Sequence, residues 1–176
     1  LEGYLVYSPG CLEKSIDCAS QENACISIDL TSPSVIANRK ENFLNILDKI
    51  HIIFGNLKEF ETLKESSDID EIIKKFSQKQ LVVITNSEKG CWVKEWGQEK
   101  AVHYPALQIP KEKVVATTGA GDFFAGGFLN GMMLGLPVKY CVEMGHLAAS
   151  KVIQVAEAEL SENSWEELRQ EIEKIT

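Results

Sequence analysis

The sequence predicts an α/β fold in which helices flank a mostly parallel sheet, and two observations support this prediction. Short apolar runs that end in turn residues alternate with longer segments whose apolar residues recur at helical spacing. The strand-like runs, such as LVVIT at residues 81–85, are apolar throughout, which is typical of parallel strands buried on both faces. A chain of 176 residues is expected to form one domain with an ordinary hydrophobic core.

The predicted elements follow from hydrophobic period and punctuation. We expect a strand at residues 4–8, a helix at 9–23 that starts at its proline, a buried strand at 24–29, a helix at 34–49 and a strand at 51–54. Asn56 and Asp68 are candidate N-caps of the next two helices, the second of which runs to residue 76. The strand at 81–85 then turns at 88–90 into antiparallel strands at 91–96 and 100–104. Three helices complete the chain at about 120–134, 138–156 and 165–175.

Composition excludes several classes of function. The 18 basic and 26 acidic residues give a formal charge of −8, which argues against nucleic-acid binding. No apolar run approaches the ~20 residues of a membrane span, so no membrane partner is expected. The five cysteines include no Cys-x-x-Cys pair that would suggest zinc, and reduced thiols in a cytoplasmic protein fit this usage.

Ligands of parallel sheets bind beyond the carboxyl ends of the strands, which directs attention to the loops at 55–56, 86–87 and 117–122. The last of these, TTGAGD, follows the apolar residues 114–116 and precedes a helix. Gly119 and Gly121 leave backbone amides unscreened where the helix dipole adds positive charge, so they can bind an anion. Asp122, in the first turn, would face the same place as a base, an arrangement that suits phosphoryl transfer to a hydroxyl group. A glycine-rich turn whose Asp merely complements the helix dipole is the alternative, and no Walker A lysine follows.

The longer stretch TTGAGDFFAGGF resembles the C-terminal signature of the ribokinase-like (PfkB) carbohydrate kinases, which phosphorylate hydroxyl groups of sugars and nucleosides with Mg-ATP. The resemblance implies that Asp122 is the catalytic base and that the amides of Gly119, Ala120 and Gly121 form the anion hole. It places Thr118, beside them, in the nucleotide site. It also implies a three-layer ribokinase-like fold.

Other segments resemble the same family in order and spacing. FGNLKEFETL resembles its Asn-x-x-Glu helix start, which implies that Asn56 and Glu59 serve magnesium and phosphates. Without the family, this pattern describes a capped helix with an exposed glutamate. LVVITNSEKGCWV resembles the strand–turn–strand that holds the nucleotide, which implies contacts from Thr85, Ser87 and Gly90. GHLAASKVIQ resembles the helix beside the adenine, with His146 at the adenine edge.

The resemblance covers nearly the whole chain but only the later portion of the family fold. IDLTSP and HLAASKVIQ favour the adenosine-kinase-like branch. The earlier portion of the family, with its Gly-Gly-x-x-x-Asn segment and its β-sheet lid, has no counterpart here. We therefore keep two alternatives: a non-catalytic nucleotide-binding remnant or subunit that self-associates or pairs with a complementary N-terminal chain, and a fragment of an ordinary enzyme.

Three positions depart from the family pattern. Ala116 replaces an Asp that commonly helps a monovalent cation, which puts potassium activation in doubt. Ser87 stands where the nucleotide loop often has glycine. Glu157 stands at about the position of a glycine near the adenine, where a long anionic side chain would weaken nucleotide binding.

Overall fold

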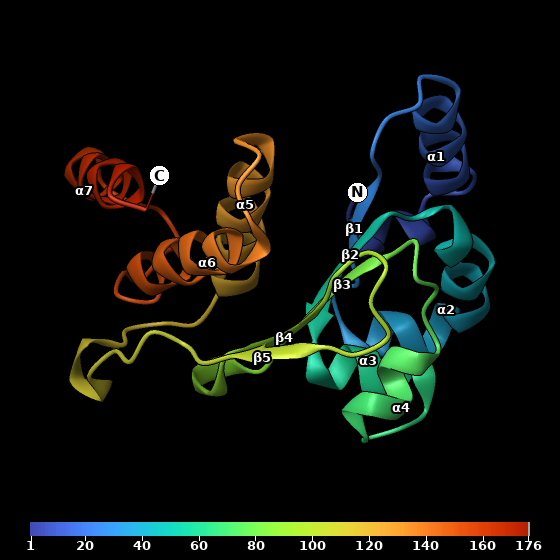
Figure 1. Ribbon diagram of the computed structural model, residues 1–176, viewed down its shortest axis with the longest axis horizontal. Helices are drawn as coiled ribbons and strands as arrows, with labels where there is room; N and C mark the ends of the chain where they lie inside the picture. The colour runs from blue at the N-terminus through green and yellow to red at the C-terminus, as the bar shows by residue number, and fades with distance from the viewer. Residues whose placement is uncertain (176) are drawn as a thin grey trace. The chain divides into compact units, whose positions relative to one another are not determined.

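The computed structural model describes residues 1–175, whose elements largely follow the predicted order (Figure 1). The strands are β1 (Ser27–Asp29), β2 (Ile52–Asn56), β3 (Leu81–Thr85), β4 (Cys91–Lys94) and β5 (Val102–Tyr104). The helices are α1 (Cys11–Gln21), α2 (Pro33–Ile46), α3 (Leu57–Lys64), α4 (Ile69–Lys74), α5 (Ala120–Met133), α6 (Val138–Val152) and α7 (Glu162–Glu173). None of these helices is both long enough and apolar enough to cross a membrane.

The chain divides into two compact units, and each is described by itself. The first, which we call the sheet unit, contains residues 1–87 and 91–103. The second, which we call the helical unit, contains residues 88–90 and the chain from residue 104 onward.

The sheet has the strand order β1-β2-β3-β4-β5. β1, β2 and β3 are parallel, with Ile28 opposite Ile53 and Ile53 opposite Val82, and β4 runs antiparallel to β3. Parallel neighbours bring their carboxyl ends to one edge, so Asp29, Asn56 and Thr85 end their strands on the same side. The predicted mostly parallel α/β fold is confirmed.

One face of the parallel strands carries the core of the sheet unit. Ile28, Ile53 and Val82 share this face because side chains alternate along a strand. They are buried in one cluster with residues of the helices that connect the strands, including Phe43 of α2, Phe60 of α3 and Ile72 of α4. Packing on these helices fixes the register of the strands that end at the candidate site.

Two segments expected to be strands are not. Residues 4–8 were expected to be extended, but Gly3–Tyr7 forms a 3₁₀-helix. The chain pairs with β1 only at the residue before this helix, where Glu2 forms a parallel bridge with Asp29. At Gly3 a side chain would stand 2.9 Å from the carbonyl oxygen of Leu30, so the chain turns there with its glycine against that backbone.

The apolar residues 114–116 were also expected to end a strand before the glycine-rich loop. They form no strand. The amides of Val115 and Ala116 instead donate to the carbonyl oxygen of Ile153, just after α6, at 2.8 and 3.3 Å. The end of α6 therefore holds the entry to α5.

In the helical unit, α5 and α6 pack backbone against backbone. A Cβ on Gly127 would stand 2.5 Å from the carbonyl oxygen of Met144, and one on Gly131 would stand 2.9 Å from Cα of Cys141. Gly145 approaches α5 in the same way, since its Cβ would lie 2.9 Å from the carbonyl oxygen of Phe124. Residues wider than glycine cannot occupy this seam without moving the helices apart.

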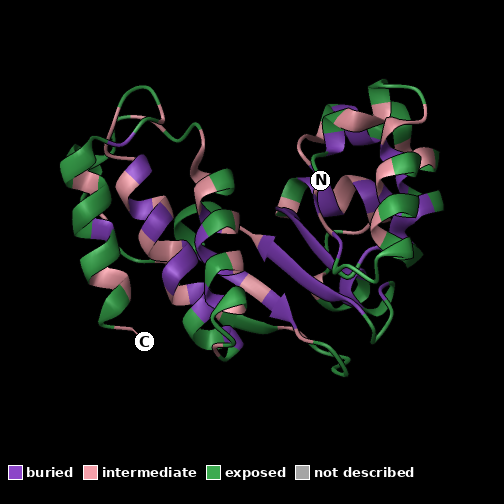
Figure 2. Ribbon diagram, turned by 90° about the horizontal axis from the view of Figure 1, so that it is seen from above, coloured by how far each residue is buried: buried purple, intermediate pink, exposed green. Residues whose placement is uncertain are grey.

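The last helix, α7, is mostly exposed, as Figure 2 shows, and Leu168 is its buried residue. Leu168 joins Ala148 and Leu160 in a small cluster. Lys151 of α6 adds ion pairs with Glu167 and Glu171, whose oxygens lie 3.2 and 3.0 Å from its Nζ. Such partly exposed pairs contribute little, so side-chain packing holds most of α7 in place.

Candidate active site

The glycine-rich turn before α5 is bare on one side and packed on the other. Gly119 is the N-cap of α5 with φ +79°, a left-handed conformation that other residues adopt only at a cost. A Cβ on Gly119 would meet Cβ of Ala158 at 3.0 Å, whereas nothing lies within 4 Å of a Cβ on Gly121. Packing therefore explains the glycine at 119, while the space beside 121 is open to a ligand.

The first turn of α5 presents amides and one carboxylate. The amide of Ala120 donates to the carbonyl oxygen of Thr117 at 3.2 Å, and the amide of Phe123 donates to that of Gly119 at 2.9 Å. First-turn amides lack partners within their own helix, and the helix dipole makes this end attractive to anions. Thr118 and Asp122 are both exposed here. The arrangement can bind an anion and remove a proton from a group beside it.

Asn56 and Glu59, in the sheet unit, form a reciprocal cap. The Asn56 side chain accepts from the amide of Glu59 at 3.0 Å, and the Glu59 carboxylate accepts from the backbone amide and side-chain Nδ2 of Asn56 at 2.7 and 2.6 Å. The expected N-cap is confirmed. The glutamate, which the capped-helix alternative placed in solvent, is instead only 3% exposed.

The residues around Glu59 determine its burial and its pKa. A Cβ on Gly55 would lie 2.9 Å from Glu59 Oε2, so glycine is needed for the carboxylate to turn back over the strand end. The pKa of Glu59 is raised to about 7, because burial and the charge of Asp29 raise it by more than the hydrogen bonds from the backbone and side chain of Asn56 lower it. Burial is the largest of these effects.

Thr85, Ser87 and Gly90 are positioned by strand ends and turns. Thr85 pairs with Asn56 in the sheet, and its hydroxyl donates to the carbonyl oxygen of Gly55 at 3.3 Å. Ser87 has φ +49°, which explains why glycine is readily accommodated at this position. Gly90, in the helical unit, has φ +97°, and a Cβ there would stand 2.0 Å from the carbonyl oxygen of Tyr104. Its glycine is therefore required by the neighbouring backbone.

His146 lies on α6 against the start of α5. Its ring is tilted over that of Phe124, with centroids 5.2 Å apart, and the residue is half-buried. Phe124 lies at the start of the second turn of α5, two residues after Asp122. Within the helical unit the structure thus brings His146 near the helix end that carries residues 119–122.

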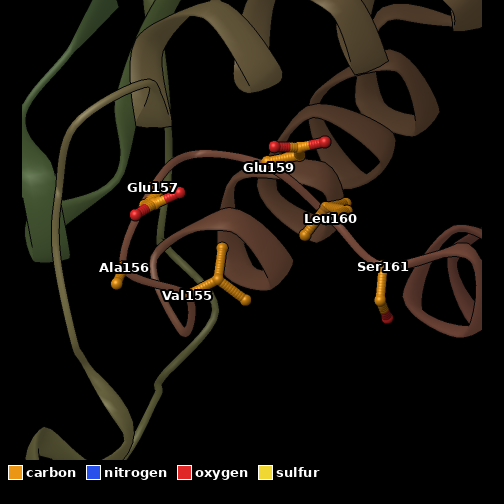
Figure 3. Close-up of a pocket in the computed structure, with 6 residues that line it drawn as sticks. All are labelled: Val155, Ala156, Glu157, Glu159, Leu160 and Ser161. Atoms are coloured by element: carbon orange, nitrogen blue, oxygen red, sulfur yellow. The ribbon is translucent and has the colours of Figure 1, made fainter.

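The sequence drew attention to the segment that follows α6 only through Glu157. A hollow of about 360 Å³ is lined by Val155, Ala156, Glu157, Glu159, Leu160 and Ser161 (Figure 3). Between the lining residues, Ala158 has φ +51°, so the glycine-favouring backbone expected near Glu157 occurs one residue later. Ala158 is also the residue that meets Gly119. A positive φ is not visible in a sequence that has alanine there.

The structure thus assembles the predicted residues in two groups. Asn56, Glu59, Thr85 and Ser87 lie at or just beyond the carboxyl edge of the sheet unit. The helical unit holds Thr118, Gly119, Ala120, Gly121, Asp122 and His146, together with Gly90.

Known proteins resemble the chain in sequence and in structure. The family that matches residues 6–165 is described as pfkB family carbohydrate kinase. Adenosine kinase 1 of Arabidopsis thaliana is 33% identical over 164 residues, which cover 86% of this chain and 47% of that protein. A 2-dehydro-3-deoxygluconokinase of Dickeya dadantii is 34% identical over 117 residues, or 65% of this chain and 37% of that protein.

Among solved structures, adenosine kinase from Sinorhizobium meliloti superposes with a TM-score of 0.86 at 27% identity, covering 97% of this chain and 53% of that one. The chain spans about half the length of the curated adenosine kinase it matches. The expectation that it corresponds to a portion of a longer fold is confirmed, as is the ribokinase-like resemblance.

Proposed function

Because the chain belongs to the pfkB family of carbohydrate kinases, we propose that it is the nucleotide-binding part of an enzyme that transfers a phosphoryl group from ATP to a hydroxyl group of a sugar or nucleoside. In this proposal its residues form one α/β domain. The observation that carries the proposal is the turn before α5, where a left-handed Gly119 and an open side at Gly121 precede the exposed Asp122.

The proposed reaction uses Asp122 as general base. The carboxylate takes the proton of the acceptor hydroxyl as its oxygen bonds to the γ-phosphorus, and the bond to the β,γ-bridging oxygen breaks so that ADP leaves with the electron pair. Amides of Gly119 and Gly121, together with that of Ala120, which also donates to the carbonyl oxygen of Thr117 at 3.2 Å, would stabilise the negative charge of the transferring group at the positive end of α5.

The remaining predicted residues would hold the nucleotide. Thr85, Ser87 and Thr118 are half-buried or exposed hydroxyl residues that can donate hydrogen bonds, and Gly90 keeps the turn compact. His146, half-buried beside Phe124, would border the base.

Magnesium would be held by Asn56 and Glu59 through water molecules. Both carboxylate oxygens of Glu59 already accept hydrogen bonds from Asn56, so direct ligation would break the cap, whereas water-mediated binding is normal for this ion. When bound, the ion supplies positive charge that neutralises phosphate oxygens. Ala116 lacks a carboxylate, and we propose no monovalent cation.

A nucleoside is the favoured acceptor. Adenosine kinase 1 is 33% identical over 164 residues, whereas the 2-dehydro-3-deoxygluconokinases match either over 117 residues at 34% identity or over 158 residues at 29%. The second candidate function is a nucleotide-binding subunit that acts with a second copy or a complementary chain. The observation behind it is that the chain spans about half of its curated relatives.

The test combines calorimetric titration with Mg-ATP and turnover assays on adenosine and a panel of sugars. In Asp122→Asn, we expect turnover to fall by about 10²- to 10⁴-fold, the usual contribution of a general base, while the Kd for Mg-ATP changes less than about twofold. Asp70→Asn is the matched control, because Asp70 is also an exposed acid in the first turn of a helix.

Unchanged turnover in Asp122→Asn would refute the role of Asp122. Binding of Mg-ATP without turnover by the unaltered chain would favour the subunit function.

A further inference from the structure

We infer that Trp165 of α7 is a positioning residue for the anion-binding turn, an inference that rests on the proposed function. The ring of Trp165 stacks on that of Phe123, with centroids 5.7 Å apart and an interplanar angle of 24°. Phe123 directly follows Asp122, so α7 contacts the helix turn that carries the proposed base.

The backbone of Phe123 is tied to the start of this turn. Its amide donates to the carbonyl oxygen of Gly119 at 2.9 Å and closes the first turn of α5. A displacement of the Phe123 ring therefore acts on the backbone of residues 119–122 through one hydrogen-bonded turn.

The packed side of the turn has few other supports. A Cβ placed on Gly119 would find Cβ of Ala158 at 3.0 Å, Cγ2 of Val152 at 3.9 Å and Cδ2 of Phe123 at 4.0 Å. Phe123 is also half-buried against the cluster of Ala148, Leu160 and Leu168. Trp165 covers Phe123 on the solvent side and is itself 41% exposed, so the stacked pair lies outside the deeper core. We call this pair, Phe123 and Trp165, the clamp, because it holds the turn from the surface.

The clamp leaves the ligand side free. Nothing lies within 4 Å of a Cβ at Gly121, and Asp122 is exposed. Amides that bind an anion work best when the turn is packed on one side and open to the ligand on the other. A turn that becomes ordered only on binding lowers the affinity, because its ordering costs free energy.

The first test needs no ligand. Hydrogen–deuterium exchange is followed by mass spectrometry in a peptide covering residues 120–127 of the unaltered chain and three variants. Trp165→Ala should speed exchange of the hydrogen-bonded amides in this peptide by about two- to twelvefold, the equivalent of one aromatic pair. Trp165→Phe should restore most of the protection, because it keeps an aromatic ring.

Trp96→Ala is the matched control. Trp96 is equally exposed, at 41%, but belongs to the sheet unit, and its replacement should leave the peptide unchanged. Thermal unfolding of each variant identifies loss of overall stability, against which the local change is judged. Unchanged exchange in Trp165→Ala, or the same change in Trp96→Ala, would overturn the inference.

The second test is titration of the same proteins with Mg-ATP. Trp165→Ala should raise the Kd by about the same two- to twelvefold, with rescue in Trp165→Phe. Faster exchange with an unchanged Kd would show that the clamp does not position the binding amides, and would overturn the inference. If no protein binds Mg-ATP, the proposed function fails, while the exchange result still decides whether Trp165 holds the turn.

Discussion

Replacement of Gly121 by alanine should separate the stability of the fold from its proposed chemistry. Gly121 lies in the first turn of α5, its φ is not positive, and a Cβ there would meet nothing within 4 Å. Alanine is the better helix former by about 0.5–1 kcal/mol in a helix interior, and the gain is smaller in a first turn. We therefore expect Gly121→Ala to stabilise the chain by about 0.5 kcal/mol, which raises Tm by roughly 1–2 °C.

The same substitution should weaken nucleotide binding. The added methyl group occupies the open side of the turn, where a phosphate must approach the amide. A hydrogen bond to a charged group contributes about 1.5–3 kcal/mol, so its loss predicts a Kd for Mg-ATP about 10- to 100-fold higher.

Gly126→Ala is the matched control, because Gly126 is in the same helix and a Cβ there also meets nothing within 4 Å. It should bring a similar or larger gain in stability and leave the Kd unchanged. The assays are differential scanning calorimetry for Tm and isothermal titration with Mg-ATP for affinity. Equal Kd values in the two variants would refute the phosphate contact at residue 121, and a lower Tm in Gly121→Ala would refute the open space.

Three further substitutions test other parts of the structure. Gly127→Ala forces a Cβ against the carbonyl oxygen of Met144 and should lower the free energy of unfolding, measured in urea, by about 1–3 kcal/mol. A much smaller decrease would contradict the direct backbone contact between α5 and α6. Asn56→Ala removes the cap and the Nδ2 donor of the buried Glu59 carboxylate, which then keeps only the backbone amide of residue 56, so a loss of about 2 kcal/mol is expected, and a loss near zero would mean the cap is dispensable. Burial lowers the pKa of Lys64 to about 8, although the Phe76 ring 4.2 Å from Nζ favours the ammonium. The Lys64 amine titrates near 10.4 in the unfolded chain and therefore binds more protons there between these values, so its own contribution to stability rises with pH from about 8 to 10. The Cys91 thiol, whose pKa burial raises to about 12, opposes this contribution at the upper end of the range. Lys64→Met should remove the contribution of Lys64, so that stability between about pH 8 and 10 changes less favourably with pH than in the unaltered chain when followed by urea unfolding, while the control Lys58→Met, whose side chain is 77% exposed, leaves the pH dependence unchanged.

Patterns within a few consecutive residues correctly predicted two helix N-caps and one buried strand. The N-caps Asn56 and Asp68 both accept hydrogen bonds at their helix starts, as their residue types indicated. The strand at 81–85 is apolar throughout and was located to the residue. Residues 4–8 also look strand-like, but their chain turns away from β1 at Gly3, and a strand requires a partner that no local pattern reveals.

Site geometry depended on contacts between distant residues. The burial of Glu59 depends on Gly55, where a Cβ would lie 2.9 Å from Glu59 Oε2, and the Asn-x-x-Glu spacing does not include this residue. The glycines of α5 look alike in sequence, yet Gly127 faces Met144 and Gly121 faces open space. The stack of Phe123 on Trp165 joins residues 42 positions apart and has no sequence signal.

The glycine seam between α5 and α6 has a mechanical consequence. Side chains at an ordinary helix contact can change rotamer and let one helix slide over the other, but Gly127, Gly131 and Gly145 bring peptide groups into direct contact, and these cannot rotate out of the way. We therefore expect α5 and α6 to move together as one rigid body. In the proposed reaction, a movement of Asp122 toward the acceptor would therefore carry His146 with it and so link the phosphate end and the base end of the proposed ATP site.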